Sequence, residues 1–423
     1  MGVRVGYKQT EVGVVPENWE VDCLRRFWSI TDCKHVTARF VSDGYSVASI
    51  REVQARFVDL TNAKQTTQQF YALLIEGGRG PRVGDLILSR NATVGELAQV
   101  AEWHPPFAMG QDVCLLRKTS PEFSTNYLQT VFRSPIVTKQ IEDSMVGSTF
   151  KRINVQTIKK FFVPMPPAPE QKVIAEALSN ADELIESLED LLVKKRDIKQ
   201  GAMQELLTGR KRLPGFSEKW RSTTVEDVIL GQFCGPSPTC EERNINGEEE
   251  WGVLKTTAIT WENGWDWTKH KTLPKVFWNR PQQEIAAGDV IVTKAGPRHR
   301  VGVTCWVDFC PRRILVSGKM IGIRPNTERV VPFMLAAAIS AREAQEYLNQ
   351  RTTGMAESQV NFENTDLLHT PIQLPQITEQ AAIASILSDM DVDISALETT
   401  LTKARLLKQG MMQELLTGRI RLV

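Results

Sequence analysis

The sequence predicts a multidomain α/β (α+β) protein with a pseudo-two-fold internal repeat, in which two mixed α/β domains are joined by two long helices that form an antiparallel coiled coil. Three observations predict this fold class. One long segment occurs twice, both copies have the apolar spacing of a helix, and the segments between them have strand-like patterns that differ from each other. The length of 423 residues allows two or three domains, or two copies of one.

The repeat is strongest in the last part of each half. Residues 170–213 match residues 379–422 without gaps at an offset of 209, and 26 of the 44 positions are identical. Weaker similarities lie upstream, where Gly84-Asp85 resembles Gly288-Asp289 and where Trp19 and Trp220 open the two halves. The chain is therefore a tandem duplication of a variable part followed by a constant part.

The constant parts are predicted to be long helices, over about 170–208 and 379–417. Prolines prevent a helix before Pro169, and Gly209 and Gly418 lie where each helix would end. At 1.5 Å per residue each helix would be roughly 58 Å long. The apolar residues recur at three- and four-residue steps and form a heptad seam: Ile174, Leu178, Ile185, Leu188, Leu192, Ile383, Leu387, Ile394, Leu397 and Leu401.

Two amphipathic helices in separate cores are the alternative to a coiled coil. A helix of this length exceeds the core of a domain of ~150 residues, and the two seams match, so pairing of the helices is favoured. The seam is interrupted where Lys199 and Lys408 occupy apolar positions.

The domain boundaries follow from the repeat. We expect a first domain over 1–150, a central conserved region over 151–213, a second domain over 214–357 and a distal conserved region over 358–423. Residues 85–90 and 289–294 have the pattern of strands, and residues 125–132 and 332–348 that of helices.

Composition excludes several classes of protein. No apolar run reaches the ~20 residues that span a bilayer. The seven cysteines form no CxxC pair and the chain has only five histidines, so no metal site is expected. Reduced thiols favour a cytoplasmic location. A net charge of +1 argues against a chain that wraps a polyanion by itself, although local basic patches are compatible with it.

Basic and polar residues cluster near the two predicted strands, in corresponding places of the two halves. Such side chains bind phosphates and base edges, whereas solvated loops with ordinary charges are the alternative. The tryptophans at 261, 265 and 267 would either stack on bases or pack a β core. The candidate DNA-binding residues are Arg79, Arg82, Arg90, Asn91, Lys151, Arg152, Lys294, Arg298, His299, Arg300 and Lys319.

Catalytic motifs are not expected in this chain. The WHPPF stretch at 103–107 resembles an amino-methyltransferase motif, but His104 stands where an amide or carboxylate is needed and no glycine-rich cofactor loop precedes it. Ser317-Gly318-Lys319 lacks the earlier glycine of a phosphate-binding loop. The sequence therefore predicts a protein that is not an enzyme by itself.

The order of motifs resembles that of the specificity (S) subunits of Type I restriction–modification systems. It runs from Trp19 through Gly84-Asp85 and the prolines at 164–167 to Glu170-Gln171, a long helix and QELLTG at 204–209, and is then repeated. The resemblance covers the whole chain. The second copy departs only near Pro375, where fewer prolines precede Glu379.

This resemblance implies a DNA-binding protein of a defence system against foreign DNA. Residues 1–150 and 214–357 would be target-recognition domains that each read one half of a bipartite, asymmetric DNA site, with the coiled coil as spacer. Catalysis would belong to two modification (methyltransferase) subunits, which bind S-adenosylmethionine and methylate adenine, and to two restriction (endonuclease and translocase) subunits, which use ATP and Mg. No cofactor is then expected in this chain.

Two other classes of function stay open at this point, a protein-binding coiled-coil scaffold without DNA readout and a solitary DNA-modifying enzyme. Beyond Lys199 and Lys408 the apolar face of each helix turns away from the seam. We interpret it as a surface for a recognition domain or for a modification subunit. The candidate partner-docking residues are Met203, Leu206, Leu207, Met412, Leu415 and Leu416.

Overall fold

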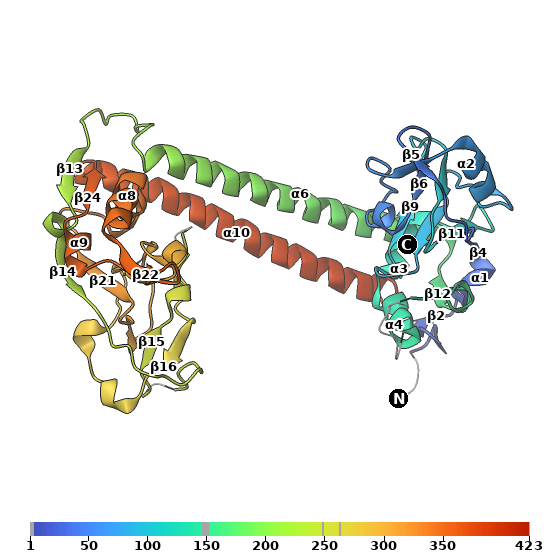
Figure 1. Cartoon of the computed structure of the whole chain (residues 1–423). Coiled ribbons are helices and arrows are strands. Elements are labelled where there is room, and N and C mark those ends of the chain that lie inside the picture. Colours follow the sequence, from blue (N-terminus) through green and yellow to red (C-terminus); the bar gives the residue numbers. More distant parts are fainter. Residues whose placement is uncertain (1–3, 146–151, 248, 262–263, 423) are drawn as a thin grey trace. The chain divides into compact units, whose positions relative to one another are not determined.

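The computed structural model of the chain describes residues 4–145, 152–247, 249–261 and 264–422. It divides into two compact units (Figure 1). Unit 1 comprises Met1–Asp190 and Glu398–Val423, and unit 2 comprises Leu191–Leu397. Each unit therefore combines one variable segment with parts of both long helices.

Unit 1 contains two four-stranded sheets, in the strand orders β4-β11-β8-β9 and β10-β6-β7-β5. A hairpin, β1-β2, opens the chain, and β3 pairs with β12. Its strands are β1 (Tyr7–Thr10), β2 (Gly13–Pro16), β3 (Glu20–Cys23), β4 (Trp28–Asp32), β5 (Phe40–Val41), β6 (Tyr45–Ala48), β7 (Lys64–Thr66), β8 (Leu86–Ser89), β9 (Leu97–Gln99), β10 (Phe107–Met109), β11 (Val113–Lys118) and β12 (Phe162–Met165). Its short helices are α1 (Leu24–Phe27), the 3-10 helix η1 (Ile50–Val53), α2 (Gln68–Ile75), α3 (Thr125–Phe132), α4 (Pro135–Ser144) and α5 (Val155–Ile158).

Unit 2 contains one four-stranded sheet, β14-β21-β17-β19, and two three-stranded sheets, β16-β15-β20 and β18-β23-β22. Strand β13 pairs with β24. The strands are β13 (Arg221–Thr224), β14 (Ile229–Phe233), β15 (Gly252–Leu254), β16 (His270–Thr272), β17 (Val290–Thr293), β18 (Ala295–Gly296), β19 (Thr304–Trp306), β20 (Ile314–Leu315), β21 (Met320–Pro325), β22 (Thr353–Ala356), β23 (Gln359–Asn361) and β24 (Pro371–Leu374). The helices are α7 (Pro332–Ser340), α8 (Arg342–Arg351) and α9 (Asn364–Leu368), with the 3-10 helices η2 (Glu226–Val228), η3 (Thr256–Ala258), η4 (Lys275–Phe277), η5 (Pro281–Gln283) and η6 (Arg298–Arg300).

The two units share one topology although their variable sequences hardly match. In each unit the first strand of the main sheet pairs with a long strand, which pairs with a buried four-residue strand, β8 or β17. In each unit a second sheet has a central strand, β6 or β15, with one antiparallel and one parallel neighbour. The duplication therefore includes the variable parts, which have kept a common topology although their sequences differ.

The predicted local elements are largely present. The apolar runs at 85–90 and 289–294 form β8 and β17, and residues 125–132 form α3, which begins where the Ser124 hydroxyl accepts a hydrogen bond from Tyr127 N. The stretch predicted to be helical over 332–348 is helical except at Ala341, whose extended backbone divides it into α7 and α8. The break falls where an almost fully buried apolar pattern changes to a mostly polar one.

The long helices are α6 (Ala168–Leu206) and α10 (Ile377–Leu415), each of 39 residues and within two residues of the expected ranges. In unit 2 Lys195 binds Asp393 at 2.9 Å and Lys199 binds Asp391. In unit 1 Glu189 binds Arg405 and Asp182 binds Lys408. Later residues of one helix meet earlier residues of the other, so the helices run antiparallel in each unit, as predicted.

The two seam lysines have a structural reason. Asp182 and Asp391 occupy the same position in the two copies, as do Lys199 and Lys408, so the ion pairs Lys408–Asp182 and Lys199–Asp391 are the same pair formed twice. The remaining predicted seam residues are buried or partly buried, with Leu192 8% and Leu401 7% exposed. Those nearest the helix starts, such as Ile174 and Ile383, belong to the cores of the units.

Of the six candidate partner-docking residues at the ends of the long helices, Leu206, Leu415 and Leu416 are buried and so cannot dock a partner subunit, whereas Met203, Leu207 and Met412 are partly buried. Leu415 and Leu416 lie in the core of unit 1 with Trp19 and Ile174, and Met412 packs against that core. In unit 2 Leu206 lies in the core, and Met203 and Leu207 pack against it. Of the two interpretations drawn from the sequence, contact with a recognition domain of the same chain is the one that the structure shows.

A buried carboxylate fastens each helix end. In unit 1 Glu170, at the start of α6, accepts hydrogen bonds from Arg421, just beyond the end of α10, and from the Trp19 indole at 2.9 Å. In unit 2 Glu379, at the start of α10, accepts two from Arg212 at 2.6 Å. We call these arrangements the carboxylate clamps. The clamps explain why the segment at 199–213 is repeated at 408–422, because each copy supplies an arginine that binds the buried glutamate at the start of the other long helix.

Glycine is required where the helices end against a tryptophan. Gly209 and Gly418 have φ of +68° and +66°, a left-handed conformation that costs other residues free energy. A Cβ at position 418 would also lie 2.5 Å from Pro16, and one at 209 would lie 3.1 Å from Trp220.

The buried helix end yields a prediction about stability. We expect Leu416→Ala to lower the free energy of unfolding by about 2–5 kcal/mol, since Leu416 is fully buried and the substitution leaves a cavity. Leu406→Ala in the same helix is the control, with an expected change within about 0.5 kcal/mol, because Leu406 is 62% exposed. Chemical denaturation followed by circular dichroism measures both, and equal effects would contradict this packing.

Candidate nucleic-acid interface

In unit 1 three backbone loops meet at one edge of the main sheet. Arg90, which follows β8, donates its backbone N–H to the carbonyl of Asp112 at 2.8 Å, and its own carbonyl accepts from Ile153 N at 2.9 Å. Asn91 and Arg152 form a bridge beside these bonds. The loop after β8, the turn before β11 and the segment before α5 are therefore held together.

Unit 2 repeats this arrangement bond by bond. Lys294, which follows β17, donates its backbone N–H to the carbonyl of Lys319 at 2.9 Å, and its carbonyl accepts from Phe362 N at 3.2 Å. Ala295 pairs with Asn361 in place of the bridge. Hence Arg90 corresponds to Lys294 and Asp112 to Lys319, and the predicted basic clusters lie at equivalent places.

Arg90 is the main correction among the candidate DNA-binding residues. Its side chain is buried, with 3% of its surface exposed, and its Nη2 lies 2.7 Å from Asp32 Oδ1 in an ion pair. A guanidinium committed to an internal carboxylate has no free face for DNA. The Arg90 side chain therefore stabilises the loops of unit 1.

The other unit 1 candidates differ in how free their side chains are. Arg79 is bound to the carbonyls of Asp32 and Glu76, and Arg152 lies 3.8 Å from Asp112 with half of its surface exposed. Arg82 is exposed and Asn91 is partly buried. Lys151 lies outside the described residues.

In unit 2 two of the five candidates have exposed side chains with no ion pair among the described residues, His299 and Lys319. Arg298 pairs with Glu357 at 2.8 Å, and Arg300 donates to the carbonyls of Thr256 and Ile259. Lys294 Nζ donates to Asn364 Oδ1 at 3.0 Å. The sequence thus located the clusters, but not which cations are engaged internally.

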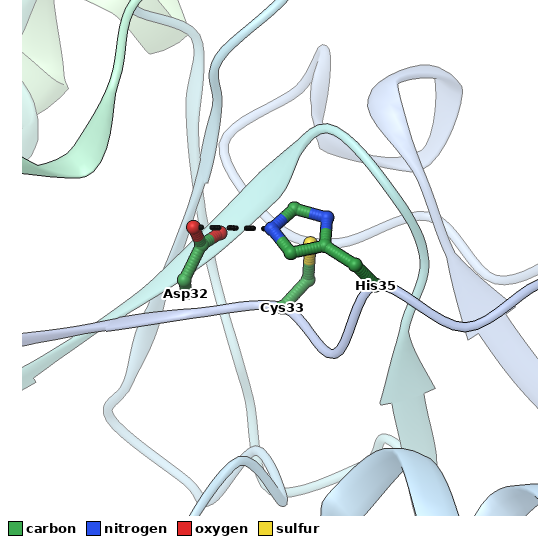
Figure 2. Close-up of side chains that lie close together, drawn as sticks. All are labelled: Asp32, Cys33 and His35. Atoms are coloured by element: carbon green, nitrogen blue, oxygen red, sulfur yellow. Dashed lines mark ion pairs between the residues drawn. The ribbon is translucent and has the colours of Figure 1, made fainter.

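Asp32, Cys33 and His35 place one potential metal ligand each within 4.8 Å of one another (Figure 2). His35 Nε2 lies 3.4 Å from Asp32 Oδ2. The cation already at this carboxylate is Arg90, and burial raises the pKa of the Cys33 thiol, so the sulfur holds its proton. The donor set fits an internal salt bridge better than a metal ion.

The Gly-Asp corners before β8 and β17 contain a repeated polar contact of unequal strength. Asp85 binds Arg117 by a short ion pair, 2.6 Å between Oδ2 and Nη2, whereas the corresponding Asp289 and Arg324 are 3.9 Å apart. Each aspartate also accepts a backbone N–H at 2.8 Å. Burial raises the pKa of Asp289 to about 6, because the distant Arg324 compensates it only weakly.

This difference predicts opposite effects of one substitution at pH 7. Asp289 binds its proton more tightly in the folded state, so its contribution to stability is present below about pH 4 and is lost as the pH rises through about 6. We expect Asp289→Asn to be neutral near pH 4 and to add about 1–3 kcal/mol to the free energy of unfolding at pH 7. Asp85→Asn should instead cost about 3 kcal/mol at pH 7, because it breaks the pair with Arg117. Chemical denaturation of both variants between pH 4 and 8 measures the free energy of unfolding. If stability changed with pH in the same way in both variants, the prediction would be contradicted.

Some features of the interface were not visible in the sequence. Ala92 and Asp112 have φ of +56° and +67°, a strained conformation for residues other than glycine, and both lie in the loops around Arg90.

Trp265 packs against a core and donates to the carbonyl of Phe309, whereas Trp261 is 43% exposed. His104 is held by Ala101 N and by the carbonyl of Val58, which is a structural role.

Two units of one topology, with different residues at one equivalent loop edge, define a protein built from two diverged copies of one domain. Among the described residues, no helix has both the length and the apolarity needed to cross a membrane.

Comparison with known proteins identifies the family. The Type I restriction modification DNA specificity domain matches residues 79–194 and 224–406, well over half of the chain. A specificity subunit of the EcoEI enzyme of Escherichia coli is 30% identical over 53% of this chain and 38% of its own length. A putative MjaX specificity subunit of Methanocaldococcus jannaschii is 26% identical over 98% of this chain and 96% of its own length.

A solved structure has the same fold. The HsdS subunit from Thermoanaerobacter tengcongensis superimposes with a TM-score of 0.54 at 17% identity, covering 96% of this chain and 98% of that one. The chain belongs to the family of Type I restriction–modification DNA specificity proteins and is a specificity subunit.

Proposed function

We propose that this chain reads a bipartite, asymmetric DNA site, one half with each unit, within a Type I restriction–modification complex. The observation that carries the proposal is the pair of units that share a topology and a carboxylate clamp but differ in the residues at one loop edge. The arginine–carboxylate pair common to both clamps fixes the frame, and the different loops give two different readouts. The role of the coiled coil as a spacer stays a prediction.

The catalytic activities belong, in this proposal, to partner subunits. Two modification subunits would supply S-adenosylmethionine and methylate adenine, and two restriction subunits would supply ATP- and Mg-dependent translocation and cleavage. The near-neutral charge of this chain supports a division in which partners share the phosphate contacts. Methyl transfer to DNA by the purified chain alone would contradict this division.

A domain exchange tests the proposed function. Residues 24–160 are replaced by those of a homologue, the chain is co-expressed with its modification subunits, and methylated sites are mapped across the host genome. We expect one half of the recognised sequence to change and the other to stay. An unchanged site, or methylation without any sequence preference, would favour a protein-binding scaffold without sequence-specific DNA readout.

A further inference from the structure

Both units contain a pocket at the same place in their fold. In unit 1 a cavity of about 490 Å³ lies between the end of β6, the strand β7 and the turn before β11, and in unit 2 a cavity of about 550 Å³ lies between β15, β16 and the turn before β21. Each cavity lies wholly within its own unit. We call them the reading pockets.

Strand register shows that the linings correspond residue by residue. Phe107 pairs with Ser46 as Ile314 pairs with Gly252, so Val47 corresponds to Val253. Both valines line the pockets. Ser49 and Lys255 each precede a 3-10 helix, and Arg51 and Thr257 are the second residues of those helices. The correspondence therefore holds for the backbone that forms each pocket.

One cation is common to both pockets. Val47 pairs with Lys64 across the sheet in the same register in which Val253 pairs with Lys271. Lys64 is exposed, and its Nζ lies 4.9 Å from the centre of the Phe40 ring. Lys271 is bound to Glu242, whose carboxylate also lies 3.7 Å from Lys255. A shared lysine at an open pocket has the chemistry of a phosphate contact.

At three other positions the pockets have different charges. Ser49 of unit 1 is equivalent to Lys255 of unit 2, Arg51 to Thr257, and Asp112 to Lys319. In the described part of the chain the side chains of Arg51 and Lys319 form no ion pair or hydrogen bond. Elsewhere in the same units Arg90 and Arg117 pair with carboxylates and Arg300 donates to two carbonyls, so Arg51 and Lys319 are cations at the pockets that remain available to a ligand.

We propose that each reading pocket is the place where its unit contacts DNA. The shared lysine, Lys64 or Lys271, binds a backbone phosphate, and the positions at which the pockets differ determine the base pairs that are read. Different residues at equivalent positions would read different bases, because arginine favours guanine O6 and N7 whereas a carboxylate accepts from the cytosine amino group. This inference rests on the proposed function, and it names the residues that carry it.

A double exchange between the pockets tests specificity. In unit 1 Arg51→Thr and Asp112→Lys install the residues of unit 2, and Thr257→Arg with Lys319→Asp is the reverse variant. Each is co-expressed with the modification subunits and its methylated sites are mapped. We expect preference at one half-site to fall by about 5- to 150-fold, the loss of one base contact, while the other half-site stays unchanged. If the double variant fails to fold, Arg51→Thr alone, at an exposed side chain, carries the test.

The shared lysine has a different expected signature. Lys64→Ala should weaken binding of the assembled complex equally to specific and random duplexes and should lower the slope of log K against log salt by about 1. Lys139→Ala, at an exposed position of α4 in the same unit, is the matched control and should leave the slope unchanged.

The outcomes separate this inference from the proposed function. If the pocket variants recognise both half-sites normally while the domain exchange changes one, the reading pockets are wrong and the function stands. If Lys64→Ala and Lys139→Ala have equal salt slopes, the phosphate contact is wrong. If the domain exchange also changes nothing, the proposed function fails with it.

Discussion

Glu170→Ala should lower the free energy of unfolding by about 3–5 kcal/mol, because it breaks the ion pair with the partly buried Arg421 and also removes the acceptor of a buried indole N–H. Glu170 is 1% exposed and accepts from both Arg421 and the indole of Trp19. The substitution leaves the guanidinium without its carboxylate and the fully buried Trp19 Nε1 without an acceptor. Because the clamp joins the end of α10 to the start of α6, the loss also loosens the helix end that carries Leu415.

Two matched variants make this prediction sharp. Glu186→Ala lies on the exposed surface of α6 and should change stability by less than about 0.5 kcal/mol. Glu379→Ala removes the second clamp but should cost less than Glu170→Ala, because Trp220 Nε1 already has no hydrogen-bond partner among the described residues. Urea denaturation measures all three, and a Glu170→Ala protein as stable as Glu186→Ala would sink the clamp as a source of stability.

The frame of this protein was predictable from the sequence because its signals are local and repeated. Apolar residues at three- and four-residue steps predict a helix wherever they occur, and two matching copies predict that the helices pair. The lysines in the seam were visible as an interruption. Their reason, the aspartates Asp182 and Asp391 on the opposite helix, required the antiparallel register.

The fate of the helix ends was not predictable, because it depends on contacts between distant residues. Glu170 and Arg421 are 251 positions apart, and nothing near Leu415 in the sequence indicates that Trp19 will cover it. An apolar face with no local partner has the same pattern whether a domain of the same chain or another protein covers it. Of the two surfaces that the sequence suggested, the one for a recognition domain of the same chain therefore holds for Leu206, Leu415 and Leu416, and the one for a partner subunit does not.

The loop edge shows the same limit for charged residues. The sequence placed Arg90 and Lys294 at equivalent positions after equivalent strands, and the backbone hydrogen bonds agree. What a cation does there depends on whether a carboxylate from another strand reaches it. Asp32, at the end of β4, reaches Arg90, whereas Lys294 meets the neutral amide of Asn364. Two residues with one sequence context thus have different roles.

Arg90→Ala should therefore destabilise unit 1 by about 2–4 kcal/mol, and Lys294→Ala should cost unit 2 only about 1 kcal/mol. Arg90 fills a buried position between Asp32 and Cys33, so its removal leaves a cavity and an uncompensated carboxylate. Asp32 is 34% exposed and gains some hydration, which keeps the cost below that of a fully buried pair. Lys294 loses one hydrogen bond to a neutral partner.

A structural role of Arg90 is distinguished from a DNA-binding role by measuring the DNA affinity of the folded variant. With denaturation curves in hand, DNA binding by the complex is compared at a temperature at which both variants are fully folded. We expect Arg90→Ala to bind as tightly as the unsubstituted protein once folded, and Arg90→Lys to recover part of the lost stability because it keeps the charge near Asp32. A folded Arg90→Ala complex with normal stability but at least tenfold weaker DNA binding would contradict this. It would show that the Arg90 side chain leaves its ion pair with Asp32 and contacts DNA, so Arg90 would again be a DNA-binding residue.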